Sequence, residues 1–275
     1  MTDQRVVAGV EGSRFSSIVH IVETGSTNAD LLAAAQSGMP EGAVLVTDHQ
    51  TAGRGRQARV WHDDPGNAVL VSVLLRPAAS SAGLIPLLYG LAASEAVESI
   101  VAATAEVPPT APSEPGGGRR LALKWPNDLL VPELGERKLA GILAEATNRG
   151  ADGGTLGVVV GMGLNLRWGS RPPDEIAARA ATLEELTGRS VERWDVVRSI
   201  LAALERWLID AERHGPATVL DAYRDRCCTL GRAVRLQRPA DVIEGVAVAV
   251  DDSGALVVET ANRRVTVTAG DAHHL

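Results

Sequence analysis

Short segments of almost continuous apolar residues constrain the fold of this chain most strongly. Residues 43–47, 68–76 and 155–166 each have this character, and we interpret all three as buried strands. Residues 84–104 instead have the spacing of a long amphipathic helix. Further helices are predicted over residues 29–37, 174–179, 183–187, 194–213 and 216–226. These strands and helices together predict an α+β domain with a mainly antiparallel sheet.

The pattern changes to short strands after residue 230. Strands are predicted over residues 233–237, 242–250, 255–260 and 263–268. Four or five strands within about 50 residues are typical of a small β-barrel. We therefore expect two domains, residues 1–228 and residues 229–275.

Charge and composition exclude several classes of protein. The net charge of −7 disfavours a general nucleic-acid-binding surface. The sequence contains neither an uninterrupted apolar run of 18 residues nor a basic start followed by an apolar stretch, so we expect no membrane span and no secretory signal. Cys227 and Cys228 are the only cysteines and have no zinc-ligand spacing around them, which favours reduced thiols in a cytoplasmic protein.

Lysine is almost absent from this sequence. Of its 27 lysine and arginine residues, only Lys124 and Lys138 are lysines, and both lie in one stretch beside a Trp-Pro-Asn-Asp turn. A lysine is a compact charge that can approach a reacting oxygen, whereas an arginine is a wide planar fork. The pattern favours a functional role for Lys138, while Lys124 is equally well explained as part of a solvated face.

A loop rich in glycine and arginine connects two of the predicted strands. Residues 53–59, the Gly/Arg loop, contain Gly53 and Gly55 with three arginines, and no carboxylate follows before Asp63 and Asp64. Glycine allows close backbone approach to a ligand, and guanidinium forks suit phosphate or carboxylate. The loop lacks the Gly-Lys-Ser/Thr of a Walker motif. An RNA-binding or merely solvated basic loop is the alternative interpretation.

Three asparagines lie at predicted element ends: Asn28, Asn127 and Asn165. Ser26 or Thr27 is a suitable N-cap for the helix that begins beside Asn28. The glycines of residues 161–163 do not complete a dinucleotide fingerprint and are better explained by close approach of a ligand to a strand. No nucleophile or metalloprotease motif is present. The set favours phosphoryl or adenylyl transfer, where positioned charges supply most of the catalysis.

Five motifs, in this order, resemble those of the biotin–protein ligases. They are Ser26-Thr27-Asn28, QTAGRGRQ at 50–57, KWPND at 124–128, KLAGIL at 138–143 and GMGLN at 161–165. The resemblance implies a mixed sheet like that of class II aminoacyl-tRNA synthetases, followed by a C-terminal barrel of the Src-homology-3 type. It also implies a two-step reaction. Biotin and ATP, with Mg²⁺, give biotinyl-5′-adenylate, and the biotinyl group then passes to a lysine of a carboxylase's biotin carboxyl carrier domain.

The same resemblance assigns site residues. It gives Lys138 and Arg56 catalytic roles. It implies biotin contacts from Ser26, Thr27, Asn28, Gln50, Gly53, Arg54, Gly55, Arg56, Lys138 and Gly141. It implies ATP or adenylate contacts from Arg54, Arg56, Arg59, Trp61, Asn127, Asp128, Lys138, Gly163, Asn165 and Trp168.

The sequence departs from part of this family. Only 25 residues precede Ser26, so we expect no helix-turn-helix domain and no operator DNA as a partner. The Gly/Arg loop lacks a further glycine often found in the family, and a flexible insertion is expected at residues 107–118. A monomer or weak homodimer is expected. A lipoate or octanoate ligase of the same fold, or a nucleic-acid-binding regulator, are the alternative functions.

Overall fold

The computed structural model describes residues 4–61, 63–104, 120–147, 157–170, 172, 174–237 and 241–275. The predicted insertion at residues 107–118 lies outside them. The first eight strands are β1 Gln4–Ala8, β2 Ser17–Thr24, β3 Val44–Gln50, β4 Ala68–Leu75, β5 Ala122–Lys124, β6 Asp128–Val131, β7 Arg137–Ala146 and β8 Val158–Asn165. The α-helices are α1 Thr27–Gln36, α2 Ile85–Thr104, α3 Asp174–Ala177, α4 Leu183–Thr187, α5 Arg193–His214 and α6 Pro216–Arg226. The remaining strands are β9 Ala233–Gln237, β10 Val242–Val250, β11 Leu256–Glu259, β12 Arg264–Val267 and β13 Asp271–His274.

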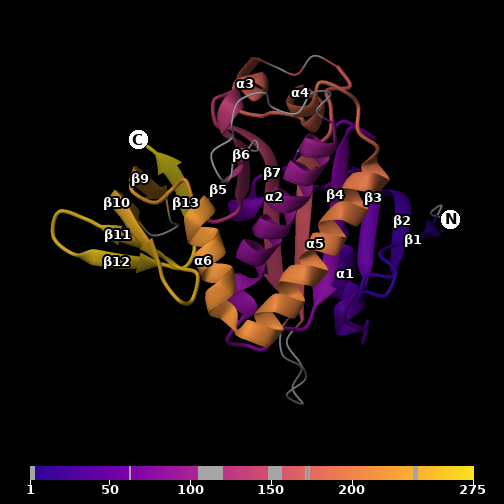
Figure 1. Cartoon of the computed structure of the whole chain (residues 1–275), viewed down its shortest axis with the longest axis horizontal. Coiled ribbons are helices and arrows are strands. Elements are labelled where there is room, and N and C mark those ends of the chain that lie inside the picture. The colour runs from indigo at the N-terminus through magenta and orange to yellow at the C-terminus, as the bar shows by residue number, and fades with distance from the viewer. Residues whose placement is uncertain are drawn as a thin grey trace.

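The first eight strands form one mixed sheet in the order β1-β2-β3-β4-β8-β7-β6-β5 (Figure 1). Among the described strands, β2 and β3 make its one parallel pair, and helix α1 connects them. Such a connection brings the carboxyl ends of both strands to the same edge of the sheet, where Thr24 pairs with Gln50. The start of α1 lies at that edge too, because the helix begins three residues after Thr24.

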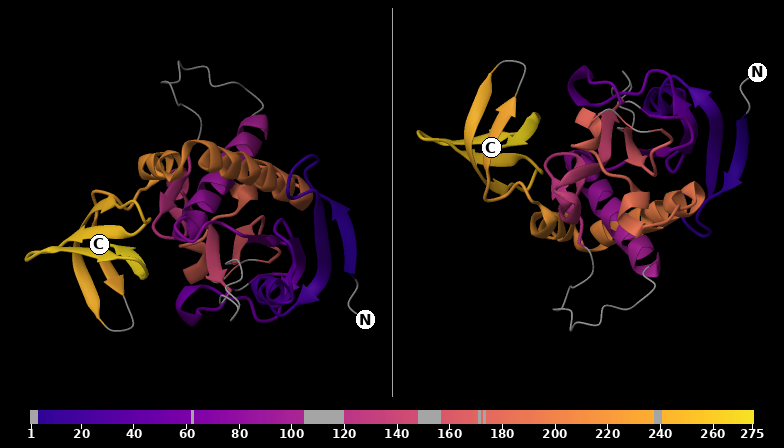
Figure 2. Two further views of the ribbon diagram at one scale, coloured as in Figure 1. Left: turned by 90° about the horizontal axis from the view of Figure 1, so that it is seen from below. Right: turned by 90° about the horizontal axis from the view of Figure 1, so that it is seen from above.

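Helices cover both faces of this sheet (Figure 2). Helices α2 and α5 lie on one face, where Val44 and Val46 of β3 join the larger hydrophobic core. Leu45 points to the opposite face and packs in a smaller cluster with Leu31 of α1. Side chains of a strand alternate between faces, so a strand covered on both sides is apolar throughout. This explains why β4 is buried at every position, and it confirms the predicted buried strands.

Helix α2 is the central helix of the core. By length and composition, residues Ala82–Thr104 would suffice to cross a membrane, but 72% of the most apolar window is buried inside the protein. The helix packs on α5 and on the sheet, which accounts for its apolar composition without a bilayer.

The last five strands form an antiparallel sheet in the order β12-β11-β10-β9-β13, beside helix α6 (Figures 1 and 2). The α+β prediction, with a small β-structure at the C-terminal end, is therefore confirmed. Strands β1 and β13 were not predicted. Most of β1 is exposed and β13 is only four residues long, so their pairing with β2 and β9 defines them rather than a local pattern.

Candidate active site

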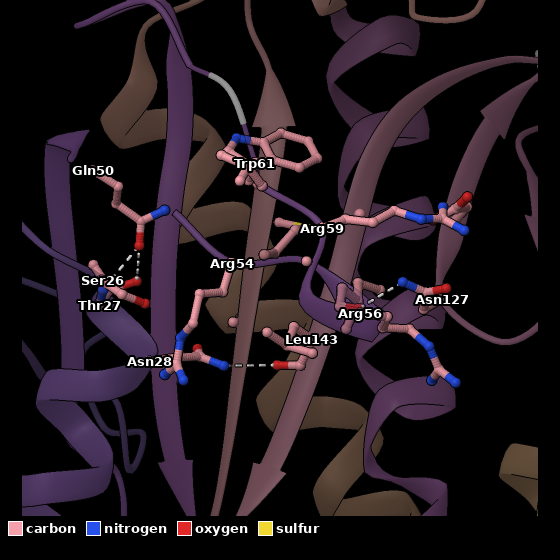
Figure 3. Close-up of a pocket in the computed structure, with 18 of the residues that line it drawn as sticks. Ser26, Thr27, Asn28, Gln50, Arg54, Arg56, Arg59, Trp61, Asn127 and Leu143 are labelled. Atoms are coloured by element: carbon pink, nitrogen blue, oxygen red, sulfur yellow. Dashed lines mark hydrogen bonds between the residues drawn. The ribbon is translucent and has the colours of Figure 1, made fainter. Parts of the chain in front are cut away.

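A cavity of about 140 Å³ opens where the carboxyl end of β3 and the middle of β7 and β8 meet the Gly/Arg loop (Figure 3). Its walls come from both sheets, because Asp271 of β13 also lines it. The full set of lining residues is Ser26, Thr27, Asn28, Gln50, Arg54, Gly55, Arg56, Arg59, Val60, Trp61, Asn127, Asp128, Lys138, Gly141, Ile142, Leu143, Gly161, Met162, Gly163 and Asp271. All five sequence motifs thus contribute to one cavity.

The start of helix α1 forms one wall of the cavity. Ser26 occupies the N-cap position but makes no side-chain capping bond, so the expected capping role is wrong for its hydroxyl. Instead the Gln50 Oε1 atom accepts hydrogen bonds from the Thr27 backbone N–H at 2.9 Å and the Thr27 hydroxyl at 3.2 Å. Strand β3 therefore caps helix α1 through a side chain that also faces the cavity.

Asn28 is held by hydrogen bonds on both sides of its amide, and Figure 3 shows the bond to the Leu143 carbonyl. Its Nδ2 donates to the Leu143 carbonyl at 3.1 Å and to Glu145 Oε2 at 2.9 Å. Its Oδ1 accepts from the Ser72 hydroxyl at 2.7 Å. A Cβ atom on Gly161 would lie 2.1 Å from Asn28 Oδ1, so glycine is required there to make room for this amide. Asn28 consequently fixes the shape of the cavity floor.

Lys138 projects from β7 into the cavity beside a carboxylate. Its Nζ lies 2.7 Å from Asp128 Oδ1 of the neighbouring strand β6 and 5.7 Å from the centroid of the Trp61 ring. The side chain keeps 34% of its surface exposed, so the ammonium is accessible from the cavity. Lys124 is absent from the cavity wall.

Trp61 lies on a glycine pair that joins β7 and β8. Gly141 and Gly163 are directly opposed, and a Cβ atom on Gly163 would come within 2.3 Å of the indole. The sequence predicted close approach of a ligand at these glycines, and the structure places an indole ring there. Typical ligand sites measure about 300–1,000 Å³. Because this cavity is smaller, a ligand larger than its 140 Å³ requires Trp61 and the Gly/Arg loop to move.

The arginines of the Gly/Arg loop are paired with residues far away in the sequence. Arg54 Nη1 lies 3.3 Å from Glu145 Oε1, and Arg59 forms an ion pair with Asp271. The sequence offered these arginines no nearby carboxylate before Asp63 and Asp64, and the fold supplies their partners from β7 and β13 instead. The nearer carboxylate of Asp63 pairs with His49 at 2.9 Å instead.

Arg56 differs from the other two arginines of the loop. Its Nη2 donates to the Gly270 carbonyl at 3.4 Å, and no ion pair with a carboxylate is found for it within the described residues. Burial lowers the pKa of its guanidinium, and the charge of Asp128 partly opposes that effect. Its neighbour Gln57 has a left-handed backbone with φ of 52°. Arg56 is thus the least compensated cation of the cavity, which suits it to bind an anion.

Three predicted site residues lie outside the cavity wall. Gly53 lines an adjoining cavity together with His49, Gln50 and Trp61. Asn165 donates to the Ala181 carbonyl at 3.1 Å, and Trp168 lies beyond the end of β8. Conversely, six residues line the cavity without having been assigned to the site: Val60, Ile142, Leu143, Gly161, Met162 and Asp271. Leu143 belongs to the recognised KLAGIL motif, whereas Asp271 carries no local signal.

Comparison with known proteins finds matches over most of the chain. The profile of the "Biotin/lipoate A/B protein ligase family" matches residues 22–165, and that of the "Biotin protein ligase C terminal domain" matches residues 229–275. The chain is 37% identical over 281 aligned residues to a biotin–[acetyl-CoA-carboxylase] ligase of Mycobacterium tuberculosis, covering 100% of this chain and 94% of the relative. It is 31% identical to the ligase of that name from Paracoccus denitrificans, covering 91% and 98%. A biotin protein ligase of Aquifex aeolicus, solved with biotin and ATP, superimposes with a TM-score of 0.72 at 27% identity, covering 93% and 97%.

Proposed function

The chain belongs to the biotin/lipoate protein ligase family, and from this premise we propose that it is an ATP-dependent biotin–protein ligase. One structural observation carries the proposal. Lys138 and three arginines of the Gly/Arg loop converge on one cavity whose opposite wall is made of neutral hydrogen-bonding groups around Gln50 and Thr27. A polar heterocycle suits the neutral wall, and a carboxylate joined to a phosphate suits the cationic one.

The first step forms an acyl-adenylate. A carboxylate oxygen of biotin attacks the α-phosphorus of ATP, the bond from that phosphorus to the β-phosphate bridging oxygen breaks, and pyrophosphate leaves. Negative charge is spread over the phosphate oxygens in this step. Lys138 offers a compact charge to those oxygens, and Arg56 offers a buried fork. Donors aimed at developing charge each contribute about 10²–10³ in rate.

The second step transfers biotin to the acceptor protein. The neutral amine of an acceptor lysine attacks the carbonyl carbon of biotinyl-5′-adenylate, the bond from that carbon to the phosphate oxygen breaks and AMP leaves, and the nitrogen releases one proton as the amide forms. We propose that the acceptor is the biotin carboxyl carrier domain of an acyl-CoA or acetyl-CoA carboxylase. Water would hydrolyse the adenylate, so a loop that closes over it protects the intermediate.

We assign to biotin the cavity wall formed by Ser26, Thr27, Asn28, Gln50 and the start of the Gly/Arg loop. We propose that Trp61 leaves the Gly141–Gly163 pair when ligand enters and then covers the adenylate. Asn165 and Trp168 retain their proposed nucleotide contacts, which require movement toward the cavity from where they lie.

The residues of the cavity fit magnesium that arrives with ATP. Among the described residues no group of three or more His, Cys, Asp or Glu side chains could hold a metal, while Asp128 lines the cavity. Mg²⁺ commonly takes one or two protein carboxylates together with substrate phosphates. We propose that Asp128 is the carboxylate nearest that ion, where the ion would neutralise phosphate charge. We also propose a cytoplasmic monomer or weak homodimer without operator DNA as a partner.

ATP–pyrophosphate exchange tests the activity directly. Biotin, lipoate and octanoate are supplied in turn, because the family includes lipoate ligases. Exchange with biotin alone is expected, followed by transfer of biotin to a carrier domain. Exchange that depends on lipoate or octanoate instead would identify the alternative ligase. No exchange with any of the three acids would reject the ligase proposal.

A further inference from the structure

We propose that Glu145 is a positioning residue that couples the Gly/Arg loop to the floor of the biotin pocket. Glu145 lies on β7 and belongs neither to the cavity wall nor to any residue set implied by the sequence motifs. The inference rests on the proposed function for its kinetic consequences. The structural coupling consists of two contacts of the Glu145 carboxylate, one with Arg54 and one with Asn28.

Each oxygen of the Glu145 carboxylate has a different partner. Oε1 lies 3.3 Å from Arg54 Nη1, at the beginning of the Gly/Arg loop. Oε2 accepts a hydrogen bond from Asn28 Nδ2 at 2.9 Å, at the start of helix α1. Figure 3 shows the Arg54 side chain extending from the loop to the Asn28 amide. A single side chain therefore connects the loop above the cavity with the wall below it.

The Asn28 contact continues through a chain of hydrogen bonds to Gln50. The Ser72 hydroxyl lies 2.7 Å from both Asn28 Oδ1 and Thr27 Oγ1, and Thr27 in turn bonds Gln50. Ser72 is fully buried and Thr27 and Asn28 are nearly so, so each of these polar groups depends on its partner. Displacement of Asn28 would consequently disturb the groups assigned to the biotin ring.

The Arg54 contact restrains one end of the loop. The other end is tied to the C-terminal sheet by the ion pair of Arg59 with Asp271. Glu145 is the carboxylate that pairs with Arg54 within the described part of the chain. Both side chains are partly exposed, at 44% for Arg54 and 26% for Glu145, so the pair is modest in energy and can open. A restraint of this strength fits a loop that must move to admit ligand.

Replacing Glu145 with glutamine separates the two contacts. Glu145→Gln keeps an oxygen that accepts from Asn28 but removes the charge that holds Arg54. We expect faster hydrogen–deuterium exchange in residues 53–59 of the free protein and a three- to tenfold higher KM for biotin, with kcat of pyrophosphate exchange changed less than KM. Glu145→Ala removes both contacts and should raise the KM for biotin further.

The matched control is Glu259→Gln, because Glu259 pairs with Arg264 at 3.1 Å on the surface of the C-terminal sheet. Glu259→Gln should leave hydrogen–deuterium exchange in residues 53–59 and the KM for biotin the same as in the parent protein. Arg54→Gln breaks the proposed contact from the loop side, which keeps the test valid if a Glu145 variant folds poorly. In the double variant Arg54→Gln/Glu145→Gln, the rise in the KM for biotin should be about three- to fivefold smaller than the product of the two single effects, because both single changes remove the same interaction.

Two results would overturn the coupling. One is that Glu145→Gln has the same hydrogen–deuterium exchange in residues 53–59 and the same KM for biotin as the parent protein. The other is strict additivity of the Arg54 and Glu145 changes. Failure of the proposed function gives a different result, since the parent itself would then lack biotin-dependent exchange. Hydrogen exchange of the loop needs no substrate and still decides the structural coupling in that case.

Discussion

Replacing Lys138 with alanine is expected to lower biotin-dependent ATP–pyrophosphate exchange by about 10²–10³-fold, the usual loss when one charge-stabilising donor is removed. The Lys138 ammonium lies on the cavity wall beside Asp128, and in this sequence lysine is used at only one other position. The assay is pyrophosphate exchange with saturating biotin and ATP, which measures adenylate formation without an acceptor protein.

Arginine should not restore activity at position 138. A Cβ atom on Gly141 would lie only 2.9 Å from Lys138 Nζ and 3.2 Å from the Trp61 ring, which shows how little space surrounds the ammonium. A guanidinium is wider than an ammonium and cannot occupy the same point. Lys138→Arg is therefore expected to remain at least about tenfold below the parent, which corresponds to about 1.4 kcal/mol in the barrier.

Loss of folding would not explain such a result. The pair of Lys138 with Asp128 is partly exposed, so its removal should cost about 1 kcal/mol or less, and Asp128 loses one partner as well. A change of this size lowers Tm by about 2–4 °C in a chain of similar length. Thermal unfolding of the variant checks this expectation.

Lys124→Arg is the matched control, since it alters the other lysine, which is absent from the cavity wall. Its exchange activity should stay within about threefold of the parent, because the charge is kept outside the reacting site. The role assigned to Lys138 is refuted if Lys138→Ala exchanges pyrophosphate as fast as the parent. If Lys138→Arg is fully active, position 138 requires a positive charge but not the compact ammonium of a lysine.

Arg56→Gly should release biotinyl-adenylate and biotinylate an unrelated protein more than the parent does, detected by a biotin blot; equal labelling with adenylate formation intact contradicts the retention role. Biotin and ATP should slow protease cleavage within residues 53–59, since the loop arginines would exchange their protein partners for ligand; equal cleavage rates contradict that. The net charge of −7 predicts no specific mobility shift of promoter DNA, with or without biotin and ATP, and a salt-resistant shift contradicts it. Burial, with Lys124 nearby, lowers the pKa of His274 from 6.5 to about 4, so its contribution to stability is complete above pH 6.5 and is lost as the pH falls toward 4; His274→Gln should flatten the dependence of Tm on pH in that window.

Much of the fold and part of the site were predictable from local sequence. Strand β4 is apolar at nearly every position because both of its faces are covered, and that pattern can be seen without coordinates. The glycine at 161 was recognised as a place of close approach, although its neighbour turned out to be the Asn28 amide. Strand β1 was not predictable, because most of its residues are exposed and β2 defines it by pairing.

The partners of the charged groups could not be predicted in the same way. The sequence placed Arg54 and Arg59 in a loop without a nearby carboxylate, and the fold supplied Glu145 and Asp271 from distant strands. Likewise, no local rule assigns Gln50 as the cap of helix α1. Side-chain partners of this kind depend on which strands the topology brings to one edge.

The sequence by itself determined the kinds of chemical group that this protein brings to its site: a single lysine on a strand, a loop of glycines and arginines, and polar residues at the ends of elements. Only the tertiary structure decided how those groups are paired when the chain folds. The positions of helices and strands depend on burial and on residues a few positions apart, so they can be predicted from the local sequence. An ion pair forms between whichever charges the packed core leaves within about 4 Å of each other, and that distance is a property of the whole fold.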